Sequence, residues 1–270
     1  MRKTITYVCL LILVVSCTAK NSKQDEFQAR IQSNEYIAFT KEKALEVVRA
    51  GFNAGEGYDE VWIRDFNTFI ELSAEVFDAE VLRENLLVFF RMQGEDGNII
   101  DGFIPREQAE KLAYDYIYLD AEPRYAGHKN TVETDQESSL VQAVFKYVQL
   151  SGDRAFLNEM IAGKSVSERL EWAMEFLMNH RFNAEYGLIW GATTADWGDV
   201  QPEHDWGVFL TDDTHYALDI YDNAMFLIAL DNLMNLIPET KRGPEAVSEA
   251  ELFPDRAQGL RSEKQIDSSR

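Results

Sequence analysis

The spacing of apolar residues along the chain predicts a protein built mainly from α-helices. Between residues 36 and 236, apolar side chains recur mostly three and four positions apart, which is the period of one helix face. Runs that alternate apolar and polar residues, as strands do, are scarce. The predicted helices cover residues 40–48, 65–76, 78–90, 136–150, 165–180 and 221–236, with a short one after residue 153. The pattern therefore predicts the all-α class.

Polar residues at the starts of these segments predict how the helices begin. Thr40 is a predicted N-cap, and the helix near residue 165 begins at a serine, at position 165 or 167. In the segment that opens the helix at residue 136, either Thr134 or Asp135 can act as the cap. Glu137 would then complete a capping box by bonding back to the cap residue.

Long connections separate several of the predicted helices. One contains Gly94, Gly97 and Gly102 and is expected to be a loop without regular structure. Another, between the helices at 165–180 and 221–236, carries three tryptophans. Loops of this length within a domain are usually either functional or disordered, and aromatic residues argue against disorder. We therefore expect functional residues in these loops.

The N-terminus has the pattern of a bacterial lipoprotein signal. Arg2 and Lys3 precede an apolar run at residues 8–15, which is too short to span a bilayer, and Ser16 and Cys17 follow. The last four residues of this stretch resemble a lipobox, so cleavage before Cys17 and lipidation of its thiol are expected. An ordinary secretory signal that is cut nearby is the alternative. Either signal predicts an exported protein, and the lipobox predicts a lipid-anchored one facing the periplasm or outer membrane.

The remaining composition restricts the partners that the chain can have. With 26 basic and 47 acidic residues, the formal net charge is −21, which disfavours binding to nucleic acid. Neutral sugars are compatible with this charge. We expect no cofactor and no protein partner, and no zinc-protease, serine-hydrolase or nucleotide-binding motif is present in the sequence.

Two short motifs at predicted helix starts could bind a polar ligand. In the first, Trp62 could stack on a sugar ring while Arg64 donates and Asp65 accepts hydrogen bonds. Asp65 could instead be an N-cap with Arg64 as its surface neighbour. In the second, Asp135 could project into a pocket at the start of the helix at residue 136, as an alternative to capping it.

The densest motif, at residues 191–215, could supply acid catalysis. Asp196 and Asp199 flank Trp197, and Trp206 follows in the same loop. A carboxyl group beside an indole loses solvation, which favours the protonated form that a general acid needs to protonate a glycosidic oxygen. The alternatives are an aspartate-capped turn or a cation site, but the aspartates lack the regular spacing of a calcium loop. We therefore predict acid catalysis here and no metal.

These motifs together resemble those of the six-hairpin glycosidases, which include glucoamylases, trehalases and debranching-type glucosidases. The resemblance covers about residues 36–244. It is carried by the W-x-R-D element at residues 62–65, the segment Glu133–Leu140, the turn Ser151-Gly152-Asp153 and the acidic loop Ala195–Asp199, which occur in the family's order.

The resemblance implies an (α/α)6 toroid in which loops from the inner helices build a pocket at one end. It implies that Arg64 and Asp65 hold the sugar, that Trp62 and Trp197 shape the pocket, and that Asp196 is the general acid. Asp199 is the substitute for that role. The expected course is inverting, which would add a second carboxylate about 6.5–9.5 Å away to activate water.

The predicted organisation has four parts. They are a signal peptide at residues 1–16, a polar tether at 17–35, a partial toroid at 36–242 and a disordered or aberrant tail at 243–270. The sequence predicts about half of the twelve helices of a toroid, so the chain is expected to be a glycoside hydrolase acting on oligosaccharides or a truncated remnant of one. Two alternatives remain open: a non-catalytic glycan-binding surface lipoprotein, and a sugar epimerase or polysaccharide lyase of the same fold.

Overall fold

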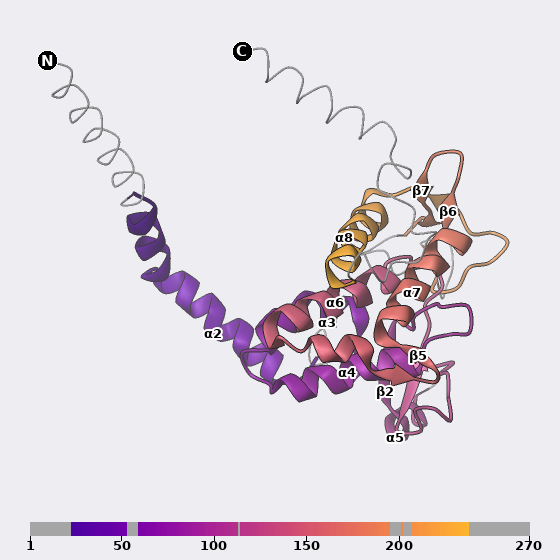
Figure 1. Ribbon diagram of the computed structural model, residues 1–270, viewed down its shortest axis with the longest axis horizontal. Coiled ribbons are helices and arrows are strands. Elements are labelled where there is room, and N and C mark those ends of the chain that lie inside the picture. The colour runs from indigo at the N-terminus through magenta and orange to yellow at the C-terminus, as the bar shows by residue number, and fades with distance from the viewer. Residues whose placement is uncertain (1–22, 53–58, 113, 195–200, 202–206, 238–270) are drawn as a thin grey trace, which may run out of the picture. The chain divides into compact units, whose positions relative to one another are not determined.

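The computed structural model describes residues 23–52, 59–112, 114–194, 201 and 207–237, and helices dominate this part of the chain (Figure 1). The chain divides into two compact units, residues 1–51 and 52–270. In the part described, no helix is both long enough and apolar enough to cross a membrane. The predicted helical class is therefore confirmed in its general form.

The helices are α2 (Glu35–Arg49), α3 (Ile63–Ser73), α4 (Ala79–Arg91), α5 (Arg106–Ala109), α6 (Gln136–Ser151), the 3-10 helix η1 (Arg154–Asn158), α7 (Val166–His180) and α8 (Ile220–Leu236). The strands are β1 (Val61–Trp62), β2 (Gly102–Pro105), β3 (Tyr125–His128), β4 (Met160–Ile161), β5 (Lys164–Ser165), β6 (Phe182–Asn183), β7 (Leu188–Ile189), β8 (Gly191–Ala192) and β9 (Tyr216–Ala217). The helices predicted at 136–150, 165–180 and 221–236 agree with α6, α7 and α8.

In the first unit, the predicted start of α2 is wrong. The helix begins at Glu35, because the side chain of Asn34 accepts hydrogen bonds from the backbone N–H groups of Tyr36 and Ile37. Thr40 lies inside the helix instead, and its hydroxyl donates to the carbonyl oxygen of Tyr36 at 2.8 Å. A threonine hydroxyl can bond the preceding turn of a helix as well as cap one, and the sequence does not distinguish these uses.

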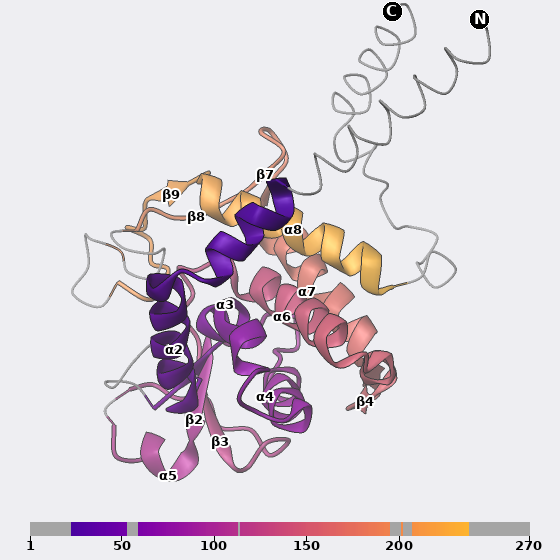
Figure 2. The same ribbon diagram turned by 90° about the vertical axis from the view of Figure 1, so that its left-hand side faces the viewer.

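Helix α6 lies at the centre of the second unit, with α3, α4, α7 and α8 packed against it (Figure 2). Leu140, Val141, Ala143 and Val144 on successive sides of α6 are all fully buried. The four surrounding helices bury these apolar side chains, which α6 could not leave in contact with water without a loss of stability.

Helices α3, α6 and α8 run parallel to one another. Arg64 in the first turn of α3 contacts Asp135 at the start of α6. Further along, the Asn67 amide donates to the Gln142 side chain at 3.4 Å, and Gln142 donates to the carbonyl oxygen of Met225 in α8 at 3.0 Å. Contacts in matching order along three helices place their N-terminal ends together.

Helices α4 and α7 run in the opposite direction to α6. Arg83 near the start of α4 pairs with Asp153, which follows the end of α6, at 3.7 Å. Arg181, just after the end of α7, donates to the carbonyl oxygen of Thr131 before the start of α6 at 2.6 Å. Parallel helices α3, α6 and α8 therefore alternate along the chain with antiparallel helices α4 and α7.

A small antiparallel sheet has the order β1-β2-β3. Its first strand, β1, lies directly before α3 in the chain, and β2 and β3 follow α4. The register of the sheet places Trp62, Gly102 and His128 side by side on the three strands. The expectation that the Gly102 region forms only an irregular loop is wrong at its end, because Gly102 begins β2. Its backbone pairs with segments far away in the sequence, which local patterns cannot reveal.

Candidate functional site

The N-terminal ends of α3, α6 and α8 meet at an ion pair between Arg64 and Asp135. The guanidinium group donates from Nε to Oδ2 at 2.7 Å and from Nη2 to Oδ1 at 2.9 Å, a bidentate arrangement. The Tyr221 hydroxyl on α8 donates to the same Oδ2 at 2.8 Å. Asp135 is fully buried and Arg64 nearly so. One carboxylate thus joins three helices and fixes the orientation of the arginine.

The charges of this group are set by burial and by the pairing itself. Burial alone lowers the pKa of Arg64, but the hydrogen bond that Arg64 donates to Asp135 and the charges of Glu133 and Asp135 raise it above its ordinary value. Burial, and then the charge of Asp135, raise the pKa of the Tyr221 hydroxyl. The arginine therefore stays charged, and the tyrosine stays protonated as a donor.

The predicted capping box at the start of α6 is wrong. Asp135 is the N-cap by position, but its side chain makes no cap hydrogen bond because Arg64 and Tyr221 occupy it. The Glu137 carboxylate accepts instead from the backbone N–H of Ile99 at 2.8 Å. Long-range partners have replaced the local bonds that the sequence suggested.

Glu133 provides a second carboxyl group beside the arginine. Its Oε1 lies 3.4 Å from Nη2 of Arg64, and its Oε2 accepts from the Gln136 amide at 2.7 Å. Burial raises the pKa of Glu133 well above its ordinary value against the lowering effect of Arg64, and the charges of Asp101 and Asp135 raise it further. A raised pKa favours the protonated form of a carboxyl group, which can donate a hydrogen bond or a proton.

An imidazole held by a carboxylate lies on the neighbouring sheet. Nδ1 of His128 is 2.8 Å from Oδ2 of Asp101. Burial lowers the pKa of His128, but the hydrogen bond and charge of Asp101 outweigh it and raise the pKa overall. Such a pair fixes the ring orientation and leaves Nε2 directed elsewhere.

At the start of α8, two further carboxyl groups lie close together. The Asp222 backbone N–H donates to Oδ1 of Asp219 at 2.8 Å. Burial, and then the charge of Asp219, raise the pKa of Asp222 to about 9. The position of a Cβ on Gly191 would be 2.6 Å from Oδ2 of Asp222 and 3.2 Å from Oγ1 of Thr134, so only glycine allows this approach.

The structure brings together some of the residues that the sequence selected. Arg64 and Asp135, 71 positions apart, are in direct contact. Trp62 lies two positions before Arg64 in the chain. Asp65 directly follows Arg64 and is buried in the first turn of α3. The remaining predicted residues lie outside the part of the chain that the structure describes: Cys17, Asp196, Trp197, Asp199 and Trp206.

The sequence interpretation missed Glu133, Asp101, His128, Tyr221 and Asp222 as site residues. Glu133 lies two positions before Asp135, so its place in the same motif was the one available signal. The others gave none, because each is positioned by pairing of strands or packing of helices that are distant in the sequence.

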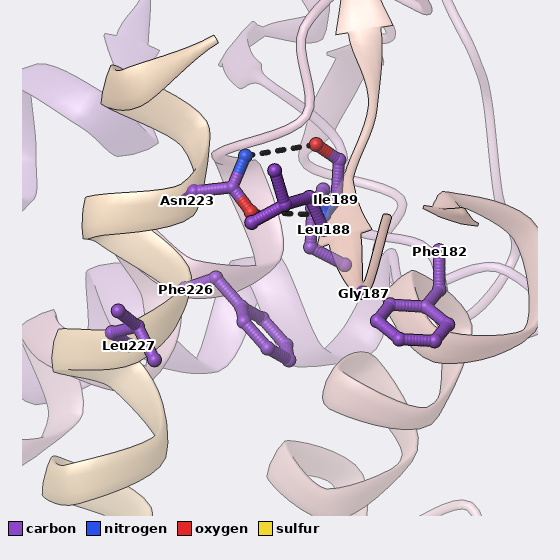
Figure 3. A pocket seen from close by; sticks show the side chains of 7 residues that line it. All are labelled: Phe182, Gly187, Leu188, Ile189, Asn223, Phe226 and Leu227. Carbon is purple, nitrogen blue, oxygen red and sulfur yellow. Dashed lines mark hydrogen bonds between the residues drawn. The ribbon is translucent and has the colours of Figure 1, made fainter. Parts of the chain in front are cut away.

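A small apolar hollow of about 40 Å³ lies between α8 and the β6–β7 hairpin (Figure 3). Asn223 fastens this hairpin by donating to the carbonyl oxygen of Ile189 and accepting from its backbone N–H, both at 2.9 Å. The lining residues are Phe182, Gly187, Leu188, Ile189, Asn223, Phe226 and Leu227. The hollow is lined by no ionisable side chain and by none of the residues around Arg64 and Asp135, so it offers no acid–base chemistry.

No family model and no curated protein sequence matches this chain. The chemistry of the candidate site is therefore inferred from the geometry of its residues. Among the residues described, no group of three or more histidine, cysteine, aspartate or glutamate side chains is arranged to hold a metal ion. The site residues can bind polar ligands through charged hydrogen bonds and exchange protons through Glu133, His128 and Asp222.

Proposed function

We propose that this chain is a glycoside hydrolase, or a part of one, built from hairpins of an (α/α)6 toroid. The observation that carries the proposal is the meeting of Arg64, Asp135 and Tyr221 where three parallel helices begin. In a toroid of this type, inner helices run parallel and alternate with outer ones, and their loops form the site. Inner helices α3, α6 and α8 with outer helices α4 and α7 fit this scheme.

The proposed chemistry is acid-assisted cleavage of a glycosidic bond. A carboxylic acid donates its proton to the bridging oxygen, the bond from that oxygen to the anomeric carbon breaks, and a second carboxylate removes a proton from the attacking water. We assign the acid to Asp196, with Asp199 as the substitute, from the sequence motif. Glu133 is a second candidate because it lies beside Arg64 and burial raises the pKa of its carboxyl group.

The binding roles are proposed from the sequence motifs. Trp62 would stack on the sugar, and Arg64 and Asp65 would bond its hydroxyl groups. Asp135 has both of its oxygens engaged by Arg64 and Tyr221, so it would contribute by fixing the guanidinium group rather than by contacting sugar. Trp197 and Trp206 complete the proposed binding set.

Hydrolysis of neutral oligosaccharides tests this function. In a purified full-length chain that releases reducing sugar, Asp196→Asn should lower kcat by roughly 10²–10⁴-fold if Asp196 is the acid. Asp213→Asn, at an exposed position, is the matched control and should leave kcat unchanged. Binding of oligosaccharides without any turnover would contradict a hydrolase and favour the glycan-binding lipoprotein.

The Asp101–His128 pair favours one second candidate, an epimerase or lyase of the same fold. These enzymes remove a proton from carbon and commonly need an oriented histidine or tyrosine base. Epimerisation or an unsaturated product, detected by NMR of the reaction mixture and abolished by His128→Gln, would establish it. Release of a saturated sugar by the His128→Gln variant would exclude it.

Export and lipid anchoring are proposed from the N-terminal sequence. The mature chain would then begin at Cys17 with lipid on its thiol and face the periplasm or outer membrane. Mass spectrometry of the mature N-terminus tests this, and an unmodified Cys17 in membrane fractions would contradict it.

A further inference from the structure

Four aromatic rings gather where β1, β2 and β3 meet the loop before β3. We call Trp62, Tyr114, Tyr116 and His128 the aromatic cluster. The ring centroids of Trp62, Tyr114 and Tyr116 lie 5.7, 6.2 and 6.2 Å from that of His128. The corresponding interplanar angles are 84°, 80° and 70°, so the rings stand edge-on and do not stack in parallel on the imidazole.

Glycine at position 102 permits this gathering. Gly102 lies between Trp62 and His128 in the sheet register, and its missing side chain leaves room for the indole. A Cβ at position 102 would be 2.5 Å from Cε3 of Trp62, which is closer than such atoms approach. The indole therefore lies over the glycine and reaches the imidazole two strands away.

Buried carboxylates or hydrogen bonds hold two members of the aromatic cluster, and a third member is exposed to solvent. Asp101 is buried and holds Nδ1 of His128, and the Tyr116 hydroxyl donates to Oε1 of Glu60 at 3.0 Å. Tyr114, in contrast, is 49% exposed. The aromatic cluster thus combines fixed polar groups with an exposed aromatic ring, and ligand sites commonly combine aromatic side chains with a few placed polar groups.

We propose that the aromatic cluster is a binding subsite for a neutral pyranose ring, next to the site at Arg64. A sugar ring presents an apolar C–H face, which aromatic rings cover, and hydroxyl groups around its rim. Among the described residues, no side chain bonds to Nε2 of His128, so this nitrogen can bond a sugar hydroxyl. The inference rests on the proposed function, and it extends the sugar contact of Trp62 to Tyr114, Tyr116 and His128.

The charges around the aromatic cluster select for a neutral sugar. Asp101, Glu60 and Asp115 all place negative charge near His128. A uronic acid would add a carboxylate among these groups, and like charges at short distance repel each other. We therefore expect neutral hexoses to bind and hexuronates to be rejected.

The test is binding of neutral gluco-, manno- and galacto-oligosaccharides of two to six units to the purified full-length chain, followed by calorimetry with the tightest binder. Tyr114→Ala should weaken binding by roughly 2–10-fold, since an aromatic contact contributes that much. Tyr186→Ala is the matched control, because Tyr186 is also an exposed tyrosine but lies in the β6–β7 turn. It should leave binding unchanged, and a hexuronate oligomer should bind more weakly than the neutral ones.

A second measurement does not depend on the variant at Tyr114. The imidazole resonance of His128, assigned with His128→Gln, should shift on saturation with the same oligosaccharide. If oligosaccharides bind or are hydrolysed but neither Tyr114→Ala nor the His128 resonance responds, the subsite is wrong and the proposed hydrolase stands. Tyr114-dependent binding without hydrolysis would leave the subsite and overturn the hydrolase. Absence of binding to every oligosaccharide overturns both.

Discussion

Replacing Asp135 by asparagine tests whether one buried carboxylate holds three helices together. The substitution keeps the size of the side chain but removes its charge. The guanidinium group of Arg64 then lies buried without its bidentate partner, and the Tyr221 hydroxyl competes with it for one amide oxygen. We expect a large loss of folding stability from a change that creates no cavity.

The size of the loss follows from the contacts. Removing one partner of a buried ion pair costs about 3–5 kcal/mol, mostly because the other charge stays buried. Here Oε1 of Glu133 lies 3.4 Å from Nη2 of Arg64 and can replace Asp135 by losing its proton. The asparagine side chain also retains one acceptor oxygen, so we expect a loss at the lower end of this range, about 3 kcal/mol. Adding Glu133→Gln removes the replacement charge and should bring the loss to about 5 kcal/mol.

Urea unfolding followed by tryptophan fluorescence and circular dichroism measures these losses, provided that the m value is unchanged. Glu110→Gln is the control, because it breaks an exposed ion pair with Arg106 at 3.5 Å and should cost less than about 1 kcal/mol. A loss for Asp135→Asn no larger than that of the control would refute the reasoning. So would a double variant no less stable than Asp135→Asn alone, since Glu133 would then provide no compensation.

Three further predictions concern single groups of the second unit. Glu133 has a raised pKa, so above pH 4.5 the native state binds more protons than the unfolded state and loses stability as the pH rises towards that raised pKa. Glu133→Gln should make this decline of stability shallower in urea unfolding at pH 5 to 8. An identical dependence of stability on pH would contradict the raised pKa. Gly191→Ala should cost about 1–3 kcal/mol, because the new Cβ would lie 2.6 Å from Oδ2 of Asp222, and an unchanged Tm would show that the carboxylate moves away freely. Ser165→Ala removes the capping box of α7 and should cost about 1 kcal/mol. Thr134→Val should be neutral, because the buried Oγ1 of Thr134 has no partner among the described residues. Equal losses of Tm in the two variants would contradict both assignments.

The site itself was only partly predictable from the sequence. Arg64 and Asp135 could be selected, because an arginine and an aspartate at predicted helix starts suggest polar recognition. Their contact with each other could not be predicted, since it requires α3 and α6 to lie side by side and parallel. The same holds for Asp101 and His128, which the pairing of β2 with β3 brings together across 27 positions.

The sequence by itself determined where most helices of the second unit lie. Helix periodicity and end signals are local, and the Ser165 capping box with Glu168 or the left-handed Gly152 at the end of α6 involves residues within one turn. Tertiary structure decided what the polar residues at helix starts do. Asp135 and Glu137 could cap α6 locally, but Asp135 pairs with Arg64 and Glu137 accepts from the backbone N–H of Ile99. Burial then set the pKa values of Glu133 and Asp222, because only packing decides which carboxyl groups lose water.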